Sequence, residues 1–136
     1  MIVLDSSLLI AYHNQKDVHH RRAVVFLDDF VEGKYGRGLL LEYVFLEVMT
    51  VLTAKLGLVP ASEVGQALLN ATELDFLPCS DFFDESWECF RNQRETAMGF
   101  ADAAIVAAAR KLAGGFVATF DAELRNTSGI RALPAR

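Results

Sequence analysis

The sequence lacks the features that mark several common protein classes. It has only two cysteines in 136 residues, Cys79 and Cys89, and no CxxC pair, so neither a disulfide scaffold nor a zinc site is predicted. A disulfide between them is an alternative, but we expect both to be reduced core residues. No run reaches about 18 apolar residues, so no membrane span is expected. No Lys or Arg precedes the N-terminal apolar run, and Asp5 breaks it early. We therefore expect no signal peptide and a cytoplasmic location.

Short apolar segments alternate with longer helical patterns along the chain. Strands are predicted at 2–4, 39–41, 74–77, 116–120 and 130–133. Helices are predicted at 8–13, 19–31, 43–56, 60–72, from Ser80 or Asp81 to 94, and at 100–112. The helix at 43–56 is apolar on nearly all sides, so we expect it to be mostly buried. With no repeat or linker, residues 1–136 are predicted to form a single α/β domain, a three-layer sandwich whose mainly parallel central sheet is flanked by helices.

Four acidic residues lie within or beside the most apolar segments. Asp5 follows the first predicted strand, Glu47 interrupts a long apolar helix, Asp102 lies early in a helix, and Asp121 closes the strand pattern at 116–120. Burying an ionised carboxylate without a partner costs several kcal/mol. Ligands of parallel sheets bind beyond the carboxyl ends of the strands, so Asp5 and Asp121 are expected to share one cleft. A divalent cation would hold the four carboxylates together.

Positive charge is scarce, since 13 Lys and Arg face 18 Asp and Glu, giving a net charge of −5. This balance argues against a broadly basic nucleic-acid surface. The four acids account for most of the imbalance, however. A cation bound among them would remove most of the repulsion toward a polyanion, so the charge decides neither way.

Each acid also has a structural alternative. Asp5 and Asp102 could be helix caps or first-turn acids, and Asp121 could end a strand and start a turn at 122–125. Glu47 could form a buried pair with a distant Arg. No Ser or Cys lies in a recognisable nucleophile motif with His13, His19 or His20, so a catalytic triad is not predicted.

Five segments, in this order along essentially the whole chain, resemble the motifs of PIN-domain ribonucleases, most closely the VapC-type toxins of prokaryotic toxin–antitoxin pairs. They are Val3-Leu4-Asp5-Ser6-Ser7-Leu8-Leu9, Asp17-Val18-His19-His20, Leu46-Glu47-Val48 with Val51-Leu52, Gly99-Phe100-Ala101-Asp102-Ala103-Ala104-Ile105 and Ala118-Thr119-Phe120-Asp121. Each motif alone is weak. Their order and spacing together carry the resemblance.

The resemblance implies a metal-dependent endoribonuclease that is the toxin of a type II pair. Its catalytic residues and ligands for one or two Mg²⁺ or Mn²⁺ ions would be Asp5, Glu47, Asp102 and Asp121. A metal-activated water would attack the phosphorus of an RNA phosphodiester. Ser6 and Thr119 are supporting candidates that could position this water or a phosphate oxygen. The implied partners are RNA, a small antitoxin protein and a second copy of the chain.

Three alternatives remain open at this stage. The first is a PIN nuclease that processes RNA without an antitoxin. The second is a receiver-like Mg²⁺-binding signalling domain, although Ser6 and Ser7 follow Asp5 where that class has a second acid, and no Lys ends the last strand motif. The third is a catalytically inactive binding module, which retention of all four acids disfavours.

The basic and the large apolar residues bear on RNA contacts and on self-association. The candidates for phosphate contacts are Arg21, Arg22, Arg91, Arg94, Arg110, Lys111 and Arg125, most of which we expect to be ordinary surface charges. We expect a homodimer, because the helices carry more large apolar residues than a domain of this size readily buries. The residues behind this expectation are Leu8, Leu9, Tyr12, Phe83 and Trp87.

Overall fold

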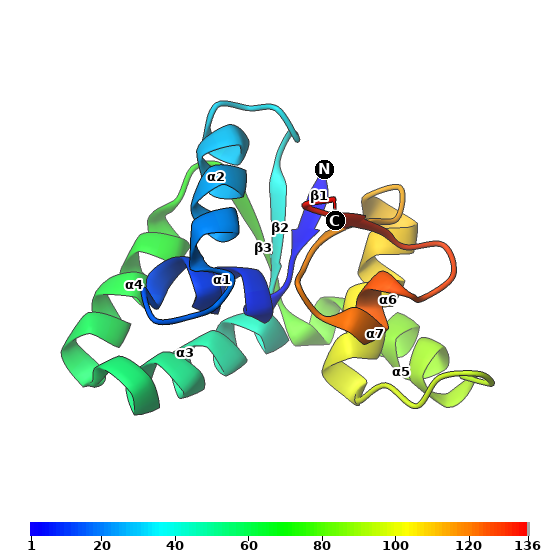
Figure 1. Ribbon diagram of the computed structural model, residues 1–136. Coiled ribbons are helices and arrows are strands. Elements are labelled where there is room, and N and C mark those ends of the chain that lie inside the picture. Colours follow the sequence, from blue (N-terminus) through cyan, green and yellow to red (C-terminus); the bar gives the residue numbers. More distant parts are fainter. Residues whose placement is uncertain (136) are drawn as a thin grey trace.

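Five short strands form one parallel sheet at the centre of the molecule (Figure 1). The computed structural model describes residues 1–135. The strands are β1 (Ile2–Leu4), β2 (Gly38–Leu41), β3 (Leu74–Leu77), β4 (Phe116–Ala118) and β5 (Arg131–Leu133). Their order is β3-β2-β1-β4-β5, and every neighbouring pair is parallel. The predicted mainly parallel sheet is confirmed.

Helices cover both faces of this sheet. They are α1 (Ser6–His13), α2 (His20–Val31), α3 (Glu42–Leu56), α4 (Leu58–Asn70), α5 (Phe83–Arg91), α6 (Phe100–Leu112) and the short α7 (Ala122–Arg125). In Figure 1, α1 to α4 lie on one side of the strands and α5 to α7 on the other, which confirms the three-layer α/β prediction. None of the described helices is both long and apolar enough to span a membrane. The single-domain assignment stays a prediction.

Continuous apolar runs explain the central strands. Ile2, Val3 and Leu4 in β1 are at most 1% exposed, because helices cover both faces and leave no solvent-facing position. β1 is also the middle strand, paired with β2 on one side and β4 on the other. A central strand covered by helices on both faces must be apolar at every position.

The chain reverses its direction of winding between β1 and β4. From β1 it moves outward through β2 to β3, then returns to the other side of β1 and continues through β4 to β5. At such a switch point the connections leave in opposite directions, which opens a crevice at the carboxyl ends of the two strands. Leu4 pairs with Ala118, so Asp5 and Thr119 face each other at that edge.

Two expectations about helices are wrong. The helix α3 buries only one stripe, Val44, Val48 and Leu52, whereas Leu46 is 65% exposed. An i, i+4, i+8 stripe is all that a helix at the edge of a core needs to bury. The segment after Pro78 is a 3₁₀ turn, Cys79–Phe82, without a side-chain cap, and α5 ends at Arg91 rather than 94. The Gln93 side chain there bonds the backbone of Met98 and closes the following loop.

Candidate active site

Asp5 is the buried centre of the carboxyl edge of the sheet. It is 4% exposed and occupies the N-cap position of α1, yet its side chain makes no capping hydrogen bond. Instead, its Oδ2 accepts hydrogen bonds from the hydroxyls of Ser7 and Thr119, both at 2.7 Å. The capping alternative for Asp5 is therefore wrong. Its carboxylate is oriented by hydroxyls from two different elements.

Ser7 and Thr119 each make a second bond that fixes them. The Phe120 N–H donates to Ser7 Oγ at 2.9 Å, and the Asp121 N–H donates to Thr119 Oγ1 at 2.9 Å. Each hydroxyl accepts a backbone proton and donates its own proton to Asp5 Oδ2, because an ionised carboxylate can only accept. Thr119 is fully buried, so its hydroxyl holds Asp5 rather than facing a phosphate.

The serine roles differ from the sequence expectation. Ser6 Oγ lies 3.5 Å from Asp5 Oδ1, a long contact, whereas Ser7 holds Asp5 closely. The sequence prediction includes Ser6 and not Ser7. A signal was available, since Ser7 lies in the first turn of the helix that begins beside Asp5, but only the tertiary contact between β1 and β4 places Phe120 and Thr119 against it.

Asp121 combines a structural role with its place at the site. It is the N-cap of α7, and its Oδ1 accepts from the Leu124 N–H at 3.0 Å. Asp121 therefore starts a helical turn, as in the structural alternative for this residue. The cap uses one of its two carboxylate oxygens. Arg125, at the end of the same helix, donates to the Thr119 carbonyl at 2.8 Å and holds the strand end beneath the site.

Asp102 has a perturbed electrostatic environment. It lies in the first turn of α6 and is half-buried. Burial raises the pKa of its carboxyl to about 6, and nearby carboxylates add to the shift: those of Asp5, Asp121, Glu47 and Glu123. The other three acids of the sequence prediction, Asp5, Glu47 and Asp121, therefore lie within electrostatic reach of Asp102, and so does Glu123, which the sequence prediction does not include. The available signal was its position in the first turn of α7, two residues after Asp121.

Glu47 lies on the solvent-facing side of α3. The apolar residues on either side of it in the sequence predict buried surroundings, but only one stripe of α3 is buried and Glu47 lies outside it, exposed to solvent. Among the described residues it forms no ion pair. The buried Glu–Arg alternative is therefore wrong.

The donor set suits a divalent cation in its chemistry. Carboxylate oxygens are the ligands that Mg²⁺ prefers, and mutual repulsion at Asp102 is what a bound cation would relieve. In the side-chain arrangement of residues 1–135, however, no three His, Cys, Asp or Glu residues are close enough together to hold an ion. The carboxylates share an electrostatic environment without an assembled coordination shell.

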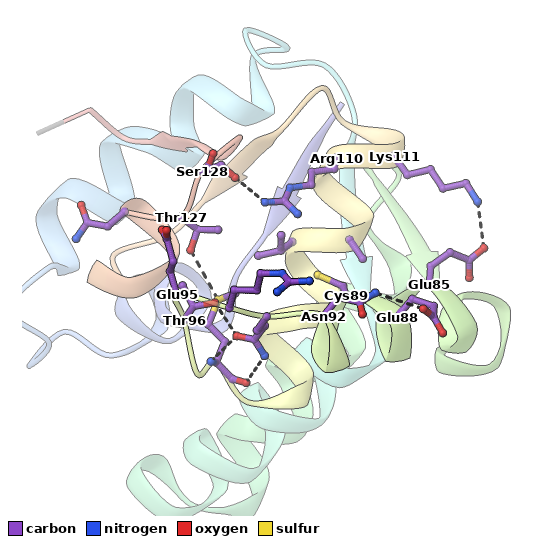
Figure 2. A pocket seen from close by; sticks show the side chains of 16 residues that line it. Glu85, Glu88, Cys89, Asn92, Glu95, Thr96, Arg110, Lys111, Thr127 and Ser128 are labelled. Carbon is purple, nitrogen blue, oxygen red and sulfur yellow. Dashed lines mark hydrogen bonds and ion pairs between the residues drawn. The ribbon is translucent and has the colours of Figure 1, made fainter.

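A separate cavity of about 900 Å³ lies between α5, α6 and the segment after α7 (Figure 2). Its lining includes Arg94, Arg110 and Lys111 but also Glu85, Glu88 and Glu95. Lys111 Nζ pairs with Glu85 Oε1 at 3.0 Å, and Arg110 donates to the Ser128 carbonyl at 2.7 Å. None of the four proposed site acids lines this cavity.

The comparisons with known proteins agree with this architecture. The PIN domain profile matches residues 2–130. No curated protein matches the sequence significantly. Among solved structures, VapC20 of Mycobacterium tuberculosis, a toxin that cleaves the sarcin–ricin loop, is similar with a TM-score of 0.79 and 22% sequence identity. That likeness covers 96% of this chain and 97% of VapC20, and at this identity it shows the fold alone. Because the profile spans nearly the whole chain, this protein belongs to the PIN-domain family.

Proposed function

We propose that this protein is a Mg²⁺- or Mn²⁺-dependent endoribonuclease and the toxin of a type II toxin–antitoxin pair. Membership of a nuclease family excludes the receiver-like alternative. The observation that carries the proposal is the buried Asp5 carboxylate at the strand-order switch point, where the Ser7 and Thr119 hydroxyls orient it. The raised pKa of Asp102, to which burial and the carboxylates of Asp5, Asp121 and Glu47 contribute, supports it.

The side chains of such a site would have two roles, binding the cation and orienting its ligands. Asp5, Glu47, Asp102 and Asp121 would hold the cation. Ser7 and Thr119 fix Asp5 through Oδ2, and among the described residues Oδ1 has only the long Ser6 contact, so it is open to a further partner. When bound, the ion supplies charge neutralisation and a more acidic water for attack on phosphorus. In the proposed hydrolysis, water oxygen bonds to phosphorus while the bond to the 3′ oxygen breaks and that oxygen takes up a proton.

RNA cleavage by the purified protein tests the enzymatic part. A mixed pool of single-stranded RNA should be cut with Mg²⁺ or Mn²⁺, leaving 5′-phosphate and 3′-hydroxyl ends, and excess EDTA should stop the reaction. Ends carrying 2′,3′-cyclic phosphate, or cleavage that persists in EDTA, would rule out the metal mechanism. Mapping the ends would also show any preferred sequence.

The toxin assignment rests on the likeness to VapC20 over nearly the full length of both chains. We expect expression in the cytoplasm of a host to slow growth, and co-expression of a small antitoxin to relieve it. An extended antitoxin segment carrying an Arg fits such a site, because a planar guanidinium bonds two carboxylates at once. Unimpaired growth despite abundant protein that is active in vitro would favour an RNA-processing nuclease without an antitoxin.

A further inference from the structure

Phe120 connects the carboxylate site with the start of α2. Its neighbours in the chain are Thr119 and Asp121. The Phe120 N–H donates to Ser7 Oγ at 2.9 Å, and the same hydroxyl donates to Asp5 Oδ2 at 2.7 Å. The backbone of Phe120 is thus two hydrogen bonds from the Asp5 carboxylate. The main chain at Phe120 therefore runs beside the Asp5 carboxylate and continues directly into Asp121.

The Phe120 ring carries two side chains from the start of α2. The His19 imidazole stacks on it with ring centroids 4.4 Å apart and planes 7° from parallel. The Arg22 guanidinium carbon lies 5.3 Å from the centroid of the same ring. We call these three residues, Phe120, His19 and Arg22, the Phe120 platform.

Arg22 retains hydrogen-bonding capacity in this position. It is exposed, and one Nη2 proton is used in a 2.8 Å bond to the Ala135 carbonyl. A guanidinium has five N–H donors, so others remain for a ligand. No carboxylate pairs with Arg22 among residues 1–135. A guanidinium against an aromatic face is held in orientation and keeps its in-plane donors for phosphate.

Two hydrogen bonds hold the start of α2, from which the platform side chains extend. The His19 backbone N–H donates to Asp17 Oδ1 at 2.8 Å, and His20 Nδ1 lies 2.8 Å from the Ala11 carbonyl of α1. These contacts tie the first turn of α2 to the preceding loop and to α1. A preformed site loses less conformational entropy on binding.

We propose that Arg22, held on Phe120 beside His19, binds a backbone phosphate of the RNA strand next to the carboxylates. The inference rests on the proposed ribonuclease function and names a residue that grips the substrate. A site built from carboxylates repels RNA, and this platform supplies a guanidinium that pairs with no carboxylate among residues 1–135. Arg22 touches substrate backbone only, so it positions the strand without reading its sequence.

The cavity in Figure 2 is the other place where basic residues gather. It is the weaker candidate, because its three cations are matched by three acids and the carboxylate site does not line it. Arg110 from that cavity is therefore a useful comparison with Arg22, since each donates one Nη2 bond to a main-chain carbonyl.

A closer control lies at the opposite end of the sheet. The Arg131 guanidinium carbon is also 5.3 Å from an aromatic centroid, that of Phe116. Both residues are the first of their strands, β5 and β4, whereas the carboxylates lie beyond the carboxyl ends. Arg131→Gln therefore removes the same charge and the same ring contact far from the site.

The experiment measures binding of a fluorescent single-stranded RNA in an Asp102→Asn background, which keeps the RNA intact. Arg22→Gln should weaken binding about tenfold. It should also make the slope of log K against log salt less steep by about 0.7, the value for one lost phosphate contact on a single strand, between about 50 and 200 mM salt. Arg131→Gln and Arg110→Gln should leave the slope unchanged. Arg22→Lys should restore the slope while binding more weakly, because it keeps the charge and loses the planar fork.

An unchanged slope in a folded Arg22→Gln protein overturns the inference, with folding checked by the thermal midpoint. Equal slope changes in the Arg22 and Arg131 variants also overturn it, since they would report general charge. A slope change in Arg110→Gln alone would overturn the inference and place the phosphate contact in the cavity that Arg110 lines. Failure of the proposed function is separate: it would appear as absence of metal-dependent cleavage by the unaltered protein.

Discussion

At the scale of single residues, Asp102 carries the clearest electrostatic signature. Its pKa of about 6 lies above the ordinary value for Asp, so the folded protein without metal binds more protons than the unfolded chain between about pH 4 and 6. Stability contributed by the protonated carboxyl is present below this window and is lost as the pH rises through it. Above pH 6 the Asp102 carboxyl is ionised, and its burial and nearby carboxylates then lower the stability of the folded protein.

Asp102→Asn should therefore have opposite effects on activity and stability. RNA cleavage should fall by about 100-fold or more. At pH 7 without metal, the variant should be more stable by about 1 kcal/mol, a value reduced for the half-exposed position, or about 3 °C in thermal midpoint. At pH 4 this gain should disappear, because the wild-type carboxyl is then protonated. Thermal melts at both pH values and a cleavage assay test this, and wild-type activity in the variant would reject Asp102 as a site residue.

Ser7 should matter to the site as well as to the fold. Ser7→Ala removes a donor to Asp5 Oδ2 and the acceptor of the Phe120 N–H, so we expect a loss of about 1–3 kcal/mol. We also expect at least about tenfold lower cleavage, as for groups that orient metal ligands.

Ser86→Ala is the matched control for Ser7→Ala. Ser86 is fully buried in α5, and its hydroxyl donates to the Phe82 carbonyl at 2.6 Å. This hydrogen bond involves none of the four site acids. It should lose stability and keep its specific activity. If both serine variants retain full activity, the hydroxyl that orients Asp5 does not contribute to catalysis.

At the scale of elements, α3 presents Glu47 on its solvent side. The position is held by the buried stripe of Val44, Val48 and Leu52 rather than by contacts of Glu47 itself. Glu47→Gln should therefore leave the thermal midpoint unchanged and reduce cleavage strongly. Glu63→Gln on exposed α4 is the control and should change neither. Full activity of Glu47→Gln would limit the site to Asp5, Asp102 and Asp121.

At the scale of the whole molecule, cation binding should stabilise the fold. A ligand present at 100 times its dissociation constant contributes about 2.7 kcal/mol, so Mg²⁺ or Mn²⁺ should raise the thermal midpoint. The increase should be smaller in Asp102→Asn and should vanish in EDTA. Equal increases in both proteins would indicate binding elsewhere.

The predicted homodimer needs a revised surface. Leu8 and Leu9 are core residues, 0% and 2% exposed, so they contribute nothing to an interface. Phe83 and Trp87 are 50% and 45% exposed and flank an aromatic cluster around Phe100. Light scattering at tens of micromolar should report a dimer, and Trp87→Glu should shift it toward monomer. A monomeric wild-type protein would contradict this prediction.

The sequence by itself determined the order of elements, the parallel three-layer architecture and the acids to examine. These follow from local physics: apolar triplets become buried strands, and glycines such as Gly57 end helices. The motif order that resembles PIN proteins was also visible, and the profile match to residues 2–130 confirms the family.

Only the tertiary structure decided how the site is supported. Ser7 and Thr119 are 112 residues apart in the chain, and their joint hold on Asp5 depends on the pairing of β1 with β4. The exposure of Glu47 depends on which stripe of α3 meets the core, and an all-round apolar pattern does not specify that stripe. The nearness of Glu123 and the stacking of His19 and Arg22 on Phe120 likewise join distant segments. Local propensity determines elements, but contacts between elements are set by global packing, which no short segment encodes.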